Sequence, residues 1–220
     1  MARQPTKPRG TDERRAALLD SARRLFVREG FADVSVSRIV REVGVAQGTF
    51  YYYFDSKEAA LDALVAAHVS EVVARLRGIS AQPGLAPWQA LQAMVRCHLD
   101  EGAERARELG AIPGADAHAK LLAATVRGLA PLYAEVIRRG QRSQSAPTGG
   151  AGLLGETLAL MAQTLFDQEL LGWTDEQYAY RRRMLAEFFG FVLSVPGGLD
   201  FGTRAAPGKA VRPSRAPRRR

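Results

Sequence analysis

The chain has 220 residues, enough for one large domain or two small ones with a substantial core. Its composition, 46% hydrophobic and 25% charged residues, is typical of a soluble globular protein. No apolar run approaches the ~18 residues of a membrane span, the charged N-terminus predicts no secretory signal, and the single cysteine excludes an internal disulfide. We therefore expect a cytoplasmic protein that does not enter a membrane.

The net charge of +8 is unevenly distributed along the chain. Residues 1–57 carry 11 basic and 7 acidic groups, which gives +4, and residues 201–220 carry seven basic groups and no acidic one. The remaining residues, 58–200, carry 13 basic and 16 acidic groups, which gives −3. Basic ends favour contact with a polyanion, although for the tail a role in solubility alone is an equal alternative.

Residues 1–10 form a basic arm and residues 201–220 a basic tail, and both are expected to be disordered. Helical periodicity dominates the sequence between them. Glycine, proline and capping residues divide the rest, with Ser35 as one N-cap, Gly44 as a break and Pro131 as an interruption. The first helix is expected from an N-cap at Thr11 or Asp12 to residue 29, and further helices are expected over 36–43, 47–53, 57–79, 87–109, 116–139, 153–171 and 175–195. No stretch alternates as a strand does, so the predicted fold class is all-α.

The two short helices expected over 36–43 and 47–53 are separated by a glycine turn. Together they form a helix-turn-helix, whose second helix can enter a DNA major groove. The second helix contains the aromatic run FYYYF at 50–54. Phe50 and Phe54 stand at i and i+4 and should pack together on the first two helices. The three tyrosines between them then point elsewhere, and a tyrosine hydroxyl can donate to a phosphate. A plain buried helix or strand is the alternative reading of this run.

The residues just before the aromatic run suit contact with base pairs. Gly48 has no side chain, so the helix can approach the bases closely. Gln47 and Thr49 carry the donors and acceptors that base edges can pair with.

Residues 11–58 resemble the DNA-binding domain of the tetracycline-repressor (TetR-like) family of transcriptional regulators. The segment AALLDSARRLFVREGFADVSVSRIVREVGVAQGTFYYYFDSKEA has Gly-Phe, Gly-Val, Gly-Thr-aromatic-Tyr and Ser-Lys-Glu in the family's order and spacing. The resemblance implies an N-terminal three-helix helix-turn-helix domain at 11–56 and a C-terminal helical effector-binding and dimerisation domain at 57–200. It also implies a homodimeric repressor that a small-molecule effector releases from pseudo-palindromic double-stranded operator DNA.

The resemblance further implies which residues meet DNA. Gln47, Gly48 and Thr49 would face bases, and Tyr51, Tyr53 and Lys57 would hold phosphates. Ser35 and Ser37, at the start of the second helix, can also reach the DNA backbone. The residues expected to contact DNA are therefore Ser35, Ser37, Gln47, Gly48, Thr49, Tyr51, Tyr53 and Lys57. Ala46 replaces a frequent serine, which leaves the recognition helix without a strong N-cap. Ser37 stands where many members have arginine.

The C-terminal part offers candidate effector and dimer residues. The helix from residue 87 has an apolar stripe with one histidine. Such a stripe is most often part of an ordinary hydrophobic core. The resemblance favours an effector cavity there, lined by Trp88, Met94 and His98, with Phe166 and Trp173 as further candidates. Apolar seams on the last two helices predict a four-helix dimer interface, with packing inside one subunit as the alternative. The interface candidates are Leu158, Met161, Leu165, Leu185, Phe188 and Val192.

Other classes of site are not supported by the sequence. Cys97 and His98 diverge by ~100° on a helix, and the other histidines stand at no ligand spacing, so no metal is expected. No phosphate loop, dinucleotide fingerprint or nucleophile elbow is present, so neither an enzyme nor a cofactor is expected. An effector-independent architectural DNA-binding protein and, last, a helical enzyme remain as alternatives. The effector, the operator and the choice between repression and activation stay open.

Overall fold

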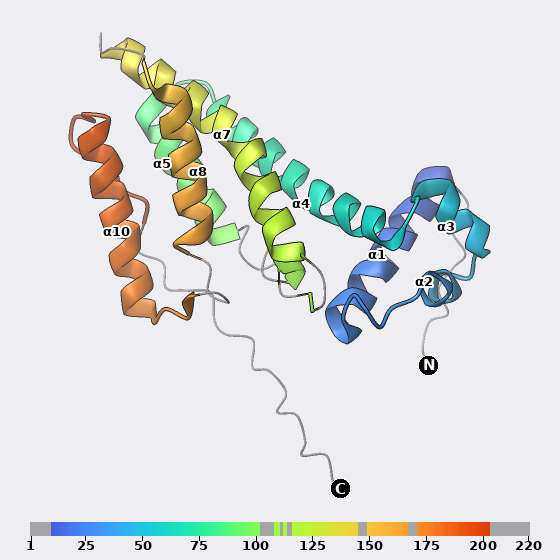
Figure 1. The fold of residues 1–220 in the computed structure, drawn as a ribbon. Coiled ribbons are helices and arrows are strands. Elements are labelled where there is room, and N and C mark those ends of the chain that lie inside the picture. The colour runs from blue at the N-terminus through green and yellow to red at the C-terminus, as the bar shows by residue number, and fades with distance from the viewer. Residues whose placement is uncertain are drawn as a thin grey trace, which may run out of the picture.

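The computed structural model describes residues 10–101, 108–110, 112–113, 116–144, 149–166 and 171–202. Over this part of the chain the regular structure is helical, which confirms the predicted all-α class (Figure 1). Residues 1–9 of the basic arm and residues 203–220 of the basic tail lie outside the described residues. The helices are α1 (Thr11–Glu29), α2 (Val36–Val43), α3 (Gln47–Tyr53), α4 (Lys57–Ser80), α5 (Pro87–Glu101), α7 (Ala117–Ser143), α8 (Ala151–Thr164) and α10 (Asp175–Val192).

The second helix begins and ends at its predicted caps, whereas α1 begins at Thr11 with Gly10 as its N-cap, in place of the expected Thr11 or Asp12. Gly30 follows α1 with φ +94°, and its N–H donates to the Phe26 carbonyl at 3.0 Å. The Ser35 side chain caps α2 by accepting from the Arg38 N–H at 3.3 Å. Gly44 ends α2 in the left-handed conformation, with φ +75°, which a side chain would disfavour.

Two hydrophobic clusters form the core, and α4 belongs to both. The first cluster joins α1, α2 and α3 to the first half of α4, and it also takes in Leu109, Ile112, Ala117 and Leu121. The second cluster gathers the far half of α4 with α5, α7, α8 and α10. The boundary expected at residue 57 therefore falls at the start of a helix that is shared by the two cores.

The long helix α4 leads from the α1–α3 group to the remaining helices (Figure 1). The interruption expected at Pro131 is absent: α7 is one helix through this position. Pro131 removes the N–H that would bond to the carbonyl of Arg127, and both residues are exposed, so water can reach the freed carbonyl. Within the described ranges, no helix is both long and apolar enough to cross a membrane.

Candidate functional site

The helix-turn-helix is formed by α2, a tight turn and α3. The N–H of Gly44 donates to the Val40 carbonyl at 2.9 Å, and the Val45 N–H donates to the same carbonyl at 3.0 Å, so the turn is closed by backbone bonds. The Ser21 hydroxyl of α1 donates to the carbonyl of Ile39 at 3.3 Å, which fixes α2 on α1. The N-cap of α3, Ala46, makes no side-chain capping bond, as the sequence suggested.

Two phenylalanines hold α3 on the rest of the domain. Phe50 is fully buried and Phe54 is 4% exposed, with their ring centroids 5.4 Å apart. This confirms the packing predicted from their spacing. The tyrosines on the other sides of the helix differ: Tyr51 is 50% exposed and Tyr52 is 76% exposed. The burial of Phe50 and Phe54 therefore leaves the opposite surface of α3 open to a partner.

The first turn of α3 brings together residues that the sequence predicted to read bases. Gln47 and Gly48 are exposed, and Thr49 is partly buried. The Ser37 hydroxyl of α2 donates to Gln47 Oε1 at 3.2 Å, so the two helices share a polar contact at this surface. A Cβ added to Gly48 would meet nothing within 4 Å. Packing inside the protein therefore gives no reason for glycine at this position.

Two residues that were expected to bind phosphate, Lys57 and Tyr53, form hydrogen bonds to other parts of the chain. Lys57 Nζ donates to the carbonyls of Phe31 at 2.5 Å and Val34 at 2.9 Å, and it lies 4.3 Å from the centroid of the Phe31 ring. The hydroxyl of Tyr53 donates to the Thr11 carbonyl at 2.9 Å. A hydroxyl has one hydrogen to donate, so a phosphate bond would have to break this contact. In the structure Lys57 therefore holds the loop after α1, and Tyr53 holds the start of α1; their contact with phosphate stays a prediction.

One basic residue beside α3 was missed by the sequence reasoning. Arg15 of α1 is exposed, and its guanidinium lies 5.3 Å from the centroid of the Phe54 ring. This stacking places a positive charge next to the recognition helix. Arg15 is one of several arginines in a charged helix, and no sequence pattern distinguishes it from the others.

Among the effector candidates, His98 is buried beside Tyr133 of the second cluster and is hydrogen-bonded at both ring nitrogens. Nδ1 is 3.0 Å from the Tyr133 hydroxyl, and Nε2 is 3.3 Å from Gln163 Oε1. An amide oxygen only accepts, so Nε2 carries the hydrogen and Tyr133 donates to Nδ1. The pKa of His98 is lowered to about 4, chiefly by burial and to a smaller extent by nearby His68, against the opposing effect of the Gln163 bond. The ring is therefore neutral at pH 7.

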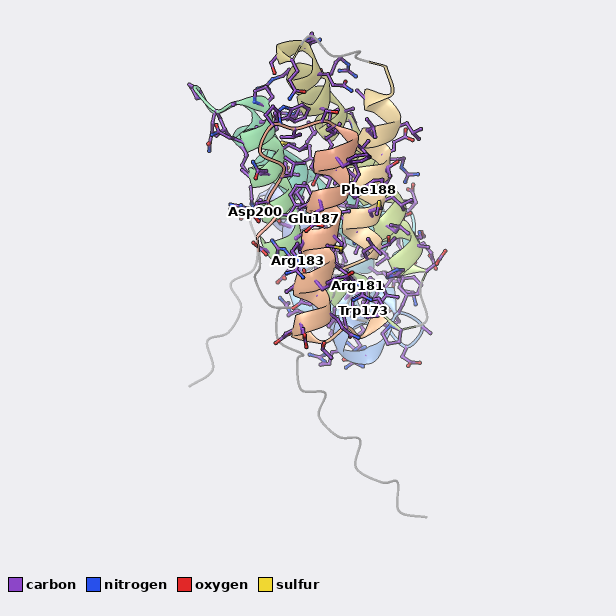
Figure 2. All side chains as sticks on the ribbon, turned by 90° about the vertical axis from the view of Figure 1, so that its left-hand side faces the viewer. Trp173, Arg181, Arg183, Glu187, Phe188 and Asp200 are labelled. Atoms are coloured by element: carbon purple, nitrogen blue, oxygen red, sulfur yellow. The ribbon has the colours of Figure 1, made fainter. Side chains whose placement is uncertain are left out.

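The other effector candidates differ in how their polar atoms are used. Met94 and Phe166 are buried side chains of the same cluster. Trp173 Nε1 donates to the Leu165 carbonyl at 2.9 Å, and the guanidinium of Arg181 stacks 3.4 Å from its ring (Figure 2). Trp88 is different, because its Nε1 is buried and has no hydrogen-bond partner in the described part of the chain. In the same described part, no group of three or more His, Cys, Asp or Glu side chains could hold a metal ion.

The dimer candidates separate into buried and exposed residues. Leu158 is fully buried and Leu185 is 2% exposed, so neither can contact a second copy unless the chain's own core opens. This corrects their predicted place in the interface. Met161 and Leu165 are partly buried, while Phe188 and Val192 are 47% and 40% exposed. Figure 2 looks onto α10 and shows Phe188 and Glu187 on the side turned to the viewer. Three more apolar residues are exposed on these two helices: Leu153 and Phe191, which belong to the predicted apolar seams, and Leu160, which does not.

Comparison with known proteins identifies the N-terminal part of the chain. Residues 18–64 match the family described as bacterial regulatory proteins, tetR family. The HTH-type transcriptional regulator EthR of Mycolicibacterium smegmatis is 43% identical over 63 residues, which cover 29% of each chain. The HTH-type transcriptional repressor KstR2 of Rhodococcus jostii is 34% identical over 72 residues, which cover 33% of this chain and 35% of that one. The matched segments thus span about a third of these relatives.

The likeness in fold extends much further than the likeness in sequence. The crystal structure of the transcriptional regulator FadR from Bacillus subtilis, in complex with stearoyl-CoA, superimposes with a TM-score of 0.54. The superposition covers 77% of this chain and 95% of that chain, at 18% identity. At this identity it is the arrangement of helices that the two proteins share.

Proposed function

Since the chain carries the DNA-binding domain of the tetR family of bacterial regulatory proteins, we propose that it is a sequence-specific transcriptional regulator. In this proposal it acts as a homodimeric repressor that a small-molecule effector releases from a pseudo-palindromic operator. Each copy places α3 in a major groove, and the two-fold symmetry of the dimer matches the two halves of the operator. The relatives with assigned names are transcriptional regulators, which argues against an enzyme.

The observation that carries the DNA-binding role is Gly48. Glycine destabilises a helix by roughly 0.5–1 kcal/mol relative to alanine, so a helical glycine without a packing reason calls for another cause. A Cβ at Gly48 would have open space around it, and the residue is exposed between Gln47 and Thr49. Close approach to a DNA backbone or base edge supplies that cause.

The test compares Gly48→Ala with Gly78→Ala on duplexes selected by the wild-type protein from a random pool. Gly78 is the matched control, because it is exposed in α4 and its Cβ would also meet nothing within 4 Å. Both variants should be slightly more stable in urea. Gly48→Ala alone should bind the selected duplexes more weakly. Equal DNA binding by both variants would count against the proposal, and a pool that yields no two-fold symmetric consensus would favour an architectural DNA-binding protein.

The proposed dimer uses the exposed apolar residues of α8 and α10. Phe191 is 85% exposed and Leu153 is 70% exposed, and large apolar side chains at such positions favour a partner surface. We assign that partner to a second copy of the chain, because a two-fold operator requires two recognition helices held at a fixed separation. Arg183 and Glu187, exposed on the same helix, offer charges of opposite sign that can pair across an isologous contact (Figure 2).

The proposed release depends on contacts between the helix-turn-helix domain and the segment that contains Leu109 and Ile112, which packs in the first cluster. The N–H of Phe31, in the loop between α1 and α2, donates to the Pro113 carbonyl at 2.8 Å. Arg23 of α1 pairs with Glu108 at 3.0 Å. An effector that moves the segment around residues 108–113 would therefore move the helix-turn-helix relative to α4 and change the separation of the two recognition helices. Differential affinity for the two arrangements is what allows an effector to release DNA.

A further inference from the structure

Two buried polar atoms lack a hydrogen-bond partner among the described residues: Trp88 Nε1 and Gln141 Oε1. One is a donor and the other is an acceptor. Gln141 is only 7% exposed, so water does not satisfy its amide oxygen from the surface. Leaving a buried polar group unpaired costs roughly 1–3 kcal/mol, and native proteins leave few such groups. Two of them at one end of a helical domain call for a shared explanation.

Both residues stand at the same end of the domain. Trp88 is the second residue of α5, and Gln141 lies in the last turn of α7. The benzo edge of the indole lies against Gly140, so closely that a Cβ there would be 2.4 Å from the ring. This contact holds Trp88 against the α7 backbone, directly before Gln141 in the chain.

The neighbouring contacts make this end of the domain a fixed frame. Arg139 donates to the Ser80 carbonyl at 3.1 Å, which ties α7 to the end of α4. The side-chain amide of Gln144 donates to the Ser194 carbonyl at 3.3 Å, which ties α7 to the segment after α10. The amide oxygen of Gln141 is therefore carried by a helix end that is tied to α4 and to the segment after α10, and the contact with Gly140 holds the indole against this helix.

The other polar effector candidates are already bonded. His98 uses both ring nitrogens, on Tyr133 and Gln163, and Trp173 donates to the Leu165 carbonyl. A ligand that bonded to these groups would first have to break bonds inside the protein. Trp88 and Gln141 can bond to a ligand without that loss, so they are better suited to recognise its polar group.

We propose that Trp88 and Gln141 hold the polar group of the effector, which is a small neutral molecule with an apolar body and one hydroxyl or primary amide. Such a group accepts from the Trp88 N–H and donates to Gln141 Oε1. A carboxylate cannot donate to Gln141, and an ammonium cannot accept from Trp88, so a charged polar group would leave one atom unpaired. The word effector rests on the proposed function; the binding site itself rests on the two unpaired atoms.

The test follows the indole N–H signals of the DNA-free protein by ¹⁵N–¹H NMR during titration with phenol, anisole or toluene. Phenol can accept and donate, anisole can only accept, and toluene can do neither. The signal of Trp88, assigned with Trp88→Phe, should shift saturably, and that of Trp173 is the internal control because its N–H is already bonded. Phenol should bind at least about fivefold more tightly than anisole, and anisole more tightly than toluene.

Gln141→Met keeps an unbranched side chain of similar length and removes the amide. In this variant phenol should lose its advantage over anisole, while both remain stronger than toluene. If the Trp88 signal does not shift saturably with phenol, or if all three probes bind alike, the two atoms are paired by ordered water only and the proposal is overturned. The same holds if Gln141→Met leaves the order of affinities unchanged.

The outcome is separable from the fate of the proposed function. Probe binding is measured without DNA, so the predicted order of affinities can hold in a protein that recognises no operator. Conversely, a protein that selects a two-fold symmetric operator but shows no ordered probe binding would retain its proposed function and lose this site.

Discussion

Replacing Lys57 with methionine should destabilise the protein and leave the salt dependence of DNA binding unchanged. Methionine keeps an unbranched side chain and removes the ammonium. The ammonium donates to the carbonyls of Phe31 at 2.5 Å and Val34 at 2.9 Å, and both bonds are partly buried. Its removal would leave these carbonyls without their charged donor and free the loop between α1 and α2.

The size of the effect follows from these two bonds. A hydrogen bond to a charged group contributes about 1.5–3 kcal/mol, and the partial exposure of Lys57 reduces the sum through solvent screening. We therefore expect a decrease of about 2–3 kcal/mol in the free energy of unfolding. With an m-value of about 2 kcal/mol/M, the urea midpoint should fall by about 1 M or slightly more. Lys120→Met is the matched control, because Lys120 forms a surface pair with Asp62 and its replacement should cost less than about 1 kcal/mol.

The assay pairs urea unfolding with DNA affinity measured over a range of salt concentrations. If Lys57 instead held a phosphate, Lys57→Met would leave the urea midpoint near that of the wild type. It would also reduce the log–log salt slope by about 0.9 for each phosphate that the variant no longer neutralises. That pair of results would refute the role assigned to Lys57 and restore the phosphate-binding role implied by the family resemblance.

Three further changes have distinct expected outcomes. As the pH falls from about 6.5 to 4, the wild type should lose about 1.4 kcal/mol of unfolding free energy per pH unit relative to His98→Gln. The reason is that burial lowers the pKa of His98 in the folded state, so the unfolded chain binds a proton that the folded chain does not. Urea midpoints of the two proteins that stay parallel across this range would contradict the prediction. Phe191→Asp should sediment as a monomer, and the urea midpoint of the single chain should not change. Leu185→Ala should instead lower the free energy of unfolding by about 2–5 kcal/mol, because it leaves a cavity in the core. If Phe191→Asp remains a dimer, the interface lies elsewhere. Gln47→Ala should change the preference among operator variants by ~1–3 kcal/mol at one base pair. Tyr51→Phe should weaken binding to all sequences alike. The opposite pattern would reverse the roles assigned to these two residues.

The sequence predicted the helix-turn-helix well because its signals are local. Ser35 and Gly44 specify a cap and a left-handed turn through neighbouring backbone groups alone. The i, i+4 spacing of Phe50 and Phe54 determines that both lie on one side of a short helix. Features of this kind depend on a few adjacent residues, so they can be inferred without knowing the rest of the fold.

The features that the sequence could not resolve depend on contacts between distant segments. Lys57 bonds to carbonyls 23 and 26 positions earlier in the chain, and its residue type is equally suited to a phosphate. Leu158 and Leu185 fit apolar seams, but a seam indicates only that a face is buried, and these two face their own subunit. Pro131 suggested a break, but its exposure allows the helix to continue. Gln141 gave no signal at all, because an unpaired oxygen is visible only once the helices are packed.

The measurement that tests the central claim most directly is a footprint of the wild-type protein on the DNA that flanks its own gene. We expect a discrete protected site with two-fold symmetry, in which two successive major grooves about one helical turn apart are covered on the same face of the duplex. Excess random DNA should not remove this protection at physiological salt. Protection that spreads evenly along the fragment, or that competes away equally with any duplex, would contradict the claim that α3 reads a specific operator.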